Sequence, residues 1–234
     1  MKENSLSAAI LRAKRRGILP LIADIKPSSP RDGALVGPRD AADLARTLVK
    51  AGACALSVVT EPKHFGGNVQ TLRQVCAAVS VPVLRKDFFS LADHVEESKA
   101  QGATAVLLIL ATIPDSLISS LYAVARRLGL EAVVEVHTRR ELARALPLAP
   151  TIIGINNRDI LNLETDEGDV RVTEELAPLV PPGIMKISES SLQTRNDILR
   201  ALRAGADGVL VGTAILRAAD PGAFLSRLIH GGMA

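Results

Sequence analysis

Short apolar runs alternate along the chain with longer segments whose apolar residues recur at helical spacing. Before the second run, for example, Leu44, Ala45 and Leu48 share one face of a predicted helix. Strands of a parallel sheet are covered on both faces and therefore read as continuous apolar runs. The predicted strands begin near Leu21, Ala55, Val81, Ala105, Ala132, Ile152, Ile184 and Gly208.

One local pattern occurs three times at the joint between a predicted helix and the next strand. It reads AGACAL at 51–56, QGATAV at 101–106 and AGADGV at 204–209. Glycine suits the left-handed position just past a helix end, and the small residues let the chain turn tightly into a strand. Repeated helix-to-strand joints indicate strands in alternation with helices, which is typical of a parallel sheet.

The number of strands and the chain length together predict the fold. The chain has 234 residues, and eight βα units of about 27 residues each fit a single (β/α)8 barrel, or TIM barrel, of the α/β class. No Pro/Gly/Ser-rich linker divides the chain, so we predict one catalytic domain over residues 1–234. Residues 1–18 form an N-terminal extension with an extra helix over Ser5–Arg16. A doubly wound open sheet is the alternative.

Composition narrows the classes of partner. The net charge is +3, which suits either nucleic acid or a phosphate ester, but the chain has only one Tyr, four Phe and no Trp. Proteins that bind nucleic acid without sequence preference usually stack bases on aromatic side chains. The composition therefore favours a small phosphorylated metabolite over nucleic acid.

The cellular setting is also predicted from composition. Apolar runs such as 105–111 are far shorter than the ~20 residues of a membrane span, and the basic N-terminus lacks the apolar stretch of a signal peptide. We expect a cytoplasmic protein that does not contact membranes. Cys54 and Cys76 are isolated, which indicates two reduced thiols.

Ionisable residues gather at the C-terminal ends of five predicted strands. These ends are 24–26 (DIK), 85–87 (RKD), Glu135, 156–158 (NNR) and 188–190 (SES). Side chains alternate along a strand, so Lys86, Glu135 and Glu189 share the face of the apolar residue two positions earlier, as Asp24 does with Ile22. A single ionisable residue at a strand end is equally well explained as a charge exposed to solvent. Ionisable residues at the ends of five strands together indicate an active site at the C-terminal mouth of the barrel.

The last two strands predict a phosphate site. Gly212 and Thr213 end the eighth strand and begin a predicted short helix over Thr213–Ala218. Backbone N–H groups at a helix start favour an anion, and barrels often hold phosphate after strands seven and eight. Ser190 and Ser191 can add donors. A plain Gly-Thr turn is the alternative.

Six motifs carry a family resemblance. They are LIADIKPSSP (21–30), VLRKDFF (83–89), VVEVH (133–137), IGINNRD (153–159), MKISES (185–190) and VLVGTAILR (209–217). In order and spacing they resemble the successive strand-end motifs of the indole-3-glycerol-phosphate synthases of tryptophan biosynthesis. The resemblance runs from about residue 21 to the last helix, and the short N-terminal extension is similar to that of the compact members.

The resemblance implies a reaction. The family closes a pyrrole ring on 1-(2-carboxyphenylamino)-1-deoxyribulose 5-phosphate with loss of carbon dioxide and water, so the enzyme is a carbon–carbon carboxy-lyase. The chemistry calls for acids, bases and a cation for the carboxylate, and for no metal or organic cofactor. The implied partner is this small phosphorylated, anthranilate-derived substrate, and we expect a monomer or weak homo-oligomer.

The resemblance also assigns roles to catalytic positions. Lys86 matches the general acid of ring closure, and Lys26 matches the lysine that pairs with the substrate carboxylate and protonates the departing hydroxyl. Glu135 matches a carboxylate that assists as a base. Glu189 and Asn156 match residues that position the lysines and the sugar.

Further positions match substrate contacts. Arg158 and Ser190 match pocket residues, Phe65, Phe88 and Leu107 match apolar contacts to the aromatic ring, and Ser29, Ser191, Gly212 and Thr213 fall where the family binds phosphate.

Two positions depart from the family pattern. Asp24 stands where the family has glutamate, and a carboxylate withdrawn by about 1 Å can slow proton transfer substantially. Ser191 stands where the family has glycine, whose backbone freedom serine lacks. We therefore expect reduced activity or a slightly altered substrate. The four histidines show no ligand spacing, and His137, near the mouth, is expected to be supporting or inert.

Two other functions stay open. A phosphosugar ketol-isomerase barrel of the histidine or tryptophan pathway would share the aspartate on strand one but would have no use for the lysine pair. A non-catalytic barrel that binds a phosphorylated ligand is allowed by Asp24 and Ser191.

Overall fold

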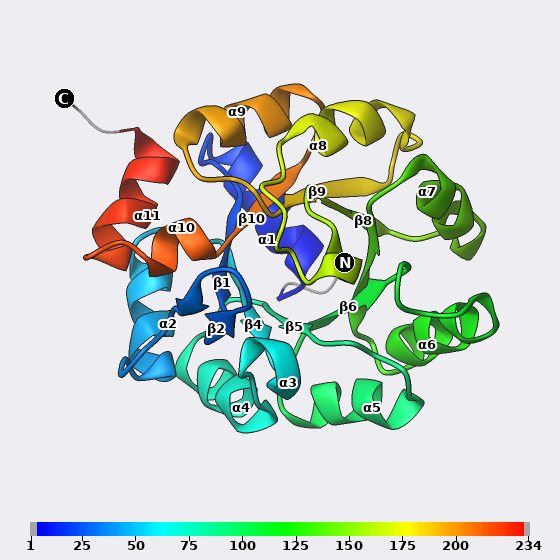
Figure 1. Ribbon diagram of the computed structural model, residues 1–234, viewed down its shortest axis with the longest axis horizontal. Helices are drawn as coiled ribbons and strands as arrows, with labels where there is room; N and C mark the ends of the chain where they lie inside the picture. Colours follow the sequence, from blue (N-terminus) through cyan, green and yellow to red (C-terminus); the bar gives the residue numbers. More distant parts are fainter. Residues whose placement is uncertain (1–3, 232–234) are drawn as a thin grey trace.

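A closed ring of parallel strands forms the centre of the computed structural model, which describes residues 4–231 (Figure 1). Its strands are β1 (Leu21–Ile25), β4 (Ala55–Val59), β5 (Val83–Lys86), β6 (Ala105–Ile109), β7 (Glu131–Val136), β8 (Ile152–Asn156), β9 (Met185–Glu189) and β10 (Gly208–Val211). Because β1 pairs with both β4 and β10, the sheet has no edge. The predicted (β/α)8 barrel is confirmed, and the open-sheet alternative is wrong.

Helices surround this ring in chain order (Figure 1). They are α2 (Ala41–Lys50), α4 (Val69–Ala78), α5 (Ala92–Ala100), α6 (Asp115–Arg127), α7 (Arg139–Ala145), α8 (Arg171–Leu176), α9 (Arg195–Arg203) and α11 (Pro221–His230), with short 3-10 segments η1 (Leu146–Leu148), η2 (Ile160–Asn162) and η3 (Ala177–Leu179). Within residues 4–231, none of the helices has both the length and the apolar character to span a bilayer.

The helix-to-strand joints follow the predicted chemistry. Gly52, Gly102 and Gly205 all have positive φ, at 113°, 93° and 106°. An L-residue with a Cβ rarely adopts such angles, so glycine lets each helix end and the next strand begin within a few residues. The three repeats predicted from the sequence therefore perform one structural task.

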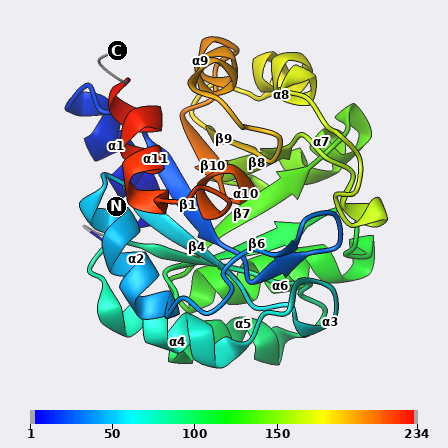
Figure 2. The same cartoon turned by 60° about the vertical axis from the view of Figure 1, so that its left-hand side comes forward.

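The predicted N-terminal helix is confirmed as α1 (Leu6–Arg15), with Ser5 as its N-cap. Leu6 and Ile10 are fully buried and join the apolar cluster inside the ring of strands. The backbone N–H of Ser7 donates a hydrogen bond to Glu131 at the start of β7, at 3.1 Å. Helix α1 thus covers the N-terminal end of the barrel, away from the strand ends that carry the polar residues (Figure 2).

Some local features differ from the sequence-based prediction. Strand β5 begins at Val83 rather than near Val81, and α10 (Thr213–Leu216) ends before the predicted Ala218. The segment after β1 forms an unpredicted hairpin of β2 (Ser28–Ser29) and β3 (Gly33–Ala34). This hairpin and the short helix α3 (Pro62–Phe65) stand at the mouth of the barrel, where they shape the cavity described next.

Candidate active site

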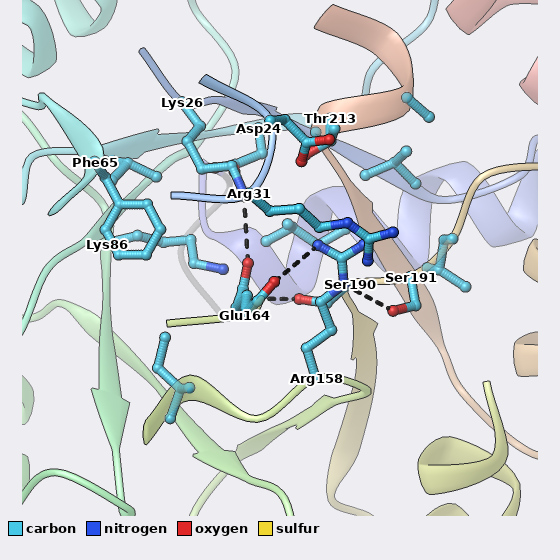
Figure 3. A pocket seen from close by; sticks show the side chains of 18 of the residues that line it. Asp24, Lys26, Arg31, Phe65, Lys86, Arg158, Glu164, Ser190, Ser191 and Thr213 are labelled. Carbon is cyan, nitrogen blue, oxygen red and sulfur yellow. Dashed lines mark hydrogen bonds and ion pairs between the residues drawn. The ribbon is translucent and has the colours of Figure 1, made fainter. Parts of the chain in front are cut away.

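A cavity of about 500 Å³ opens at the C-terminal ends of the strands. The predicted site residues in its wall are Asp24, Lys26, Phe65, Lys86, Phe88, Leu107, Glu135, Arg158, Ser190, Ser191, Gly212 and Thr213 (Figure 3). Three others lie outside the wall: Glu189 and Asn156 are buried behind it, and Ser29 lies in the hairpin. The parity of the strand ends thus brings the predicted residues to one place.

Lys86, the last residue of β5, forms an ion pair with Glu189 of β9, at 3.0 Å between Nζ and Oε2. Burial opposes the charge on Lys86, but the carboxylates of Glu189, Asp24 and Glu135 outweigh it and raise the pKa of the lysine. Burial raises the pKa of Glu189 to about 7, with Lys86 opposing and Glu135 adding to the rise. Lys86 is therefore a partly buried ammonium group facing the cavity.

Glu135, on β7, is held against His137. The imidazole Nε2 lies 3.3 Å from Glu135 Oε1, while Nδ1 lies 2.9 Å from Glu141 Oε2. Burial lowers the pKa of His137, but the two carboxylates outweigh it and raise it to about 10. His137 is thus positively charged at neutral pH. It supports Glu135 from behind.

Glu164 is the principal residue that the sequence analysis missed. Its Oε2 lies 3.4 Å from Lys26 Nζ, and its Oε1 accepts hydrogen bonds from Ser190 Oγ at 2.9 Å and Asn156 Nδ2 at 3.3 Å. Burial raises its pKa, but the charges of Lys26 and Lys86 and these donors outweigh it and lower it to about 2. No periodic signal marks Glu164, because it lies in the irregular segment between β8 and α8.

Asp24 is packed tightly at the end of β1. Its Oδ1 accepts a hydrogen bond from Ser57 Oγ at 2.7 Å. A Cβ atom on Gly212 would lie 2.9 Å from the Cβ of Asp24, closer than real Cβ contacts allow. Asp24 lies beside Thr213 in Figure 3. The shorter carboxylate therefore sits under the end of β10, against the predicted phosphate end of the cavity.

An apolar wall forms the opposite end of the cavity. The rings of Phe65 and Phe88 lie 6.4 Å apart at an interplanar angle of 55°. Leu107 and Ile160 add apolar surface to the same cavity wall. Lys26 Nζ lies 5.7 Å from the centre of the Phe65 ring, close enough for a cation–π contact. A ligand ring packed against this wall would lie close to the ammonium group of Lys26.

The predicted phosphate end is made of the start of α10 and the loop after β9. Gly212 is the N-cap of α10, so the first backbone N–H groups of this short helix lie in the cavity wall. Ser190 and Ser191 have φ of 63° and 57°, a left-handed conformation that costs a non-glycine residue free energy. The hydroxyl of Ser191 accepts a hydrogen bond from Arg158 Nε at 3.1 Å. Serine at this position therefore fixes the arginine.

The hairpin brings charges that the sequence analysis missed. Ser29 Oγ accepts a hydrogen bond from the Asp32 backbone N–H, at 2.9 Å, and its hydroxyl donates to the Asp32 carboxylate, at 3.1 Å. Asp32 also forms an ion pair with Arg217 at 3.0 Å. Arg31 lines the cavity and donates to the backbone carbonyl of Asp166, at 2.7 Å. The hairpin is thus tied to the loops after β8 and β10.

Two further predictions concern cysteine and metal. Cys54 and Cys76 are free thiols, as predicted, and burial raises their pKa values to about 12 and about 11. Across residues 4–231, the structure contains no group of three or more histidine, cysteine or acidic side chains arranged to hold a metal ion.

Ammonium groups and carboxylates beside an apolar wall, at the mouth of a (β/α)8 barrel, are typical of enzymes that use acid–base chemistry. The family model of indole-3-glycerol phosphate synthase matches residues 2–228. The chain therefore belongs to the indole-3-glycerol phosphate synthase family.

Relatives support this assignment. The indole-3-glycerol phosphate synthase of Thermococcus kodakarensis is 43% identical over 225 residues, covering 96% of this chain and 97% of that protein. That of Halalkalibacterium halodurans is 41% identical over 232 residues, covering 99% and 88%. A solved structure titled "Native KDPGal structure" has a TM-score of 0.64 at 17% identity and covers 90% of both chains. At that identity it shows the shared fold alone.

Proposed function

We propose that this chain catalyses ring closure of 1-(2-carboxyphenylamino)-1-deoxyribulose 5-phosphate to indole-3-glycerol phosphate, as a carbon–carbon carboxy-lyase. One observation carries the proposal. Two lysines, each paired with a buried glutamate, lie in a single cavity whose wall includes Phe65 and Phe88. Membership of the family supports the choice of substrate.

We place this substrate in the cavity in one orientation. The anthranilate ring packs against the apolar wall that includes Phe65, Phe88 and Leu107, with its carboxylate toward Lys26. The phosphate lies at the other end, against the backbone of Ser191, Gly212 and Thr213. The ribulose chain then spans the space between, with its ketone near Lys86.

The side chains perform the steps as follows. Lys86 protonates the ketone oxygen while the ring carbon that bears the carboxylate bonds to the ketone carbon. Loss of carbon dioxide returns an electron pair to the ring and restores its aromaticity. Lys26 then protonates the departing hydroxyl, and Glu135 removes a proton from the methylene carbon next to nitrogen, so water leaves. Glu189 and Asn156 act through the lysines and Glu164.

Other parts of the proposal follow from the sequence. Residues 1–234 act as one catalytic domain, although 1–3 and 232–234 lie outside the described residues. We expect the enzyme to act in the cytoplasm as a monomer or weak homo-oligomer, without a metal or organic cofactor.

A turnover assay tests the function directly. The product contains an indole ring and fluoresces, so incubation of the purified protein with the substrate is expected to give a rising indole signal. A ketol-isomerase would convert a phosphosugar without forming indole, and a binding protein would hold the substrate unchanged. Absence of indole formation by a folded protein would overturn the proposal.

A further inference from the structure

Glu164 occupies the place where the proposed function puts the carboxylate of the substrate. Its Oε2 lies 3.4 Å from Lys26 Nζ, and both side chains are about nine-tenths buried. Within residues 4–231, Glu164 is the only carboxylate that the structure places within ion-pair distance of Lys26. The charge of Lys26 is therefore compensated by a side chain of the protein itself (Figure 3).

The two oxygens of Glu164 have different partners. Oε1 accepts from the neutral donors Ser190 and Asn156, whereas Oε2 faces Lys26. A combined change of the Glu164 side-chain torsions can therefore move Oε2 away from the lysine, and the Ser190 hydroxyl can turn to keep its hydrogen bond to Oε1. The backbone stays in place during such a change, because the Glu164 carbonyl accepts from Arg158 and its N–H donates to the carbonyl of Asp159.

The local backbone points this side chain inward. Leu163 and Glu164 both have a left-handed conformation, with φ of 53° and 56°. Two successive non-glycine residues in this region are unfavourable, and such conformations persist only where the surroundings hold them. Here that conformation presents a carboxylate to a buried lysine.

We propose that Glu164 is the resident counter-ion of Lys26, which holds the position of the substrate carboxylate and gives it up when substrate binds. This inference rests on the proposed function. Two carboxylates on one buried ammonium group repel each other, so binding requires Glu164 to withdraw. Decarboxylation then removes the competing anion as neutral carbon dioxide, and Oε2 returns to Lys26. Glu164 is a specificity residue that weakens the binding of carboxylated ligands relative to their decarboxylated counterparts.

A matched pair of ligands tests the proposal. The first is the substrate with its ketone reduced to an alcohol, which cannot close the ring, and the second is the same molecule without its carboxylate. Dissociation constants are measured by calorimetry for the wild type, Lys26→Met, Glu164→Gln and Glu167→Gln. The last variant makes the same charge change on the same loop, at an exposed position.

The counter-ion role predicts a selective gain. Glu164→Gln should bind the carboxylated ligand about tenfold more tightly, while affinity for the decarboxylated ligand stays within about twofold. Glu167→Gln should change neither. Glu164→Asp, which keeps the charge but shortens the side chain, should show a smaller gain and provides a second variant if glutamine impairs folding.

Other outcomes separate two kinds of failure. If Glu164→Gln loses affinity for both ligands equally, or changes neither, Glu164 is a structural residue and the counter-ion role is wrong. If Lys26→Met leaves the affinity for the carboxylated ligand unchanged, Lys26 does not hold a carboxylate. In that case the proposed orientation of the substrate is wrong, and this inference fails with it, whereas indole formation in the turnover assay tests the reaction separately.

Discussion

The two lysine–glutamate pairs of the cavity contain the same kinds of side chain, but the pKa of the glutamate is raised in one pair and lowered in the other. Lys86 and Glu189 lie on strands β5 and β9, 3.0 Å apart, and the pKa of Glu189 is raised to about 7. Lys26 and Glu164 lie 3.4 Å apart, and the pKa of Glu164, on a loop, is lowered to about 2. Both carboxylates are buried beside an ammonium group.

The difference lies in the remaining neighbours. Burial raises the pKa of both carboxyl groups. The negative charges of Glu135 and Asp24 raise the pKa of Glu189 further. Its Oε1 also lacks a hydrogen-bond partner within residues 4–231. Glu164 instead receives two side-chain hydrogen bonds and a second positive charge from Lys86. Donors and neighbouring charges, rather than burial, set which carboxylate can change its protonation state near neutral pH.

Loss of the strand lysine should have the largest effect. Lys86→Met is expected to lower kcat at least ~10²-fold, because the ketone oxygen loses its proton donor. Lys26→Met should lower kcat and also raise KM, since the departing hydroxyl loses its proton donor and the substrate carboxylate loses its cation. Steady-state fluorescence kinetics on both variants separate the two effects. Near-normal kcat in Lys86→Met would remove this residue from the acid role.

Added volume beside Glu189, in the Lys86–Glu189 pair, should lower the stability of the fold. A Cβ atom at Gly154, on β8, would overlap Glu189 Oε1 and lie 2.9 Å from Val133 Cγ1. We expect Gly154→Ala to lower the free energy of unfolding by about 2 kcal/mol, because a packed strand cannot move aside. Gly208→Ala on β10 is the control, since its Cβ would meet atoms no closer than 3.3 Å. Urea unfolding that ranks the two variants equally would contradict this reasoning.

The two glutamates should differ in their pH dependence. As pH rises through about 7, Glu189 becomes ionised and holds Lys86 in place, so kcat of the wild type should rise over that range. Glu189→Gln should remove this rise and lower the plateau about tenfold. His137, whose pKa is about 10, keeps one charge state over the same range. Glu164→Gln should leave the midpoint unchanged because Glu164 is already ionised. A midpoint that survives in Glu189→Gln would assign it to another group.

The smallest expected effect concerns Ser191, in the loop after β9, whose hydroxyl binds Arg158 near the Lys26–Glu164 pair. Ser191→Gly and Ser191→Ala both remove the hydroxyl that binds Arg158, but only glycine relieves the φ of 57°. Ser191→Gly should therefore be more stable than Ser191→Ala by about 1 kcal/mol in chemical unfolding. Equal stabilities would show that the left-handed conformation costs serine little here.

The sequence analysis predicted both members of the Lys86–Glu189 pair, but of the Lys26–Glu164 pair it predicted only the lysine. Alternation along a strand placed Lys86 and Glu189 on the cavity side, because period and closure of the barrel leave little freedom there. Glu164 depends on two successive left-handed residues after the 3-10 segment η2. Arg31 depends likewise on a hairpin whose strands are two residues long. Such loop conformations depend on tertiary contacts, and the spacing of apolar residues along the sequence does not predict those contacts.

The position of helix α1 limits how substrate enters and products leave the barrel. Its buried Leu6 and Ile10 close one end of the barrel, so substrate access and product release share the opposite mouth. Under the proposed reaction, carbon dioxide and water form while the loops after β9 and β10 still hold the phosphate. Both small molecules must then diffuse out alongside the bound glycerol phosphate chain. Carbon dioxide forms in the step before dehydration, so it can leave before water and before the phosphorylated product.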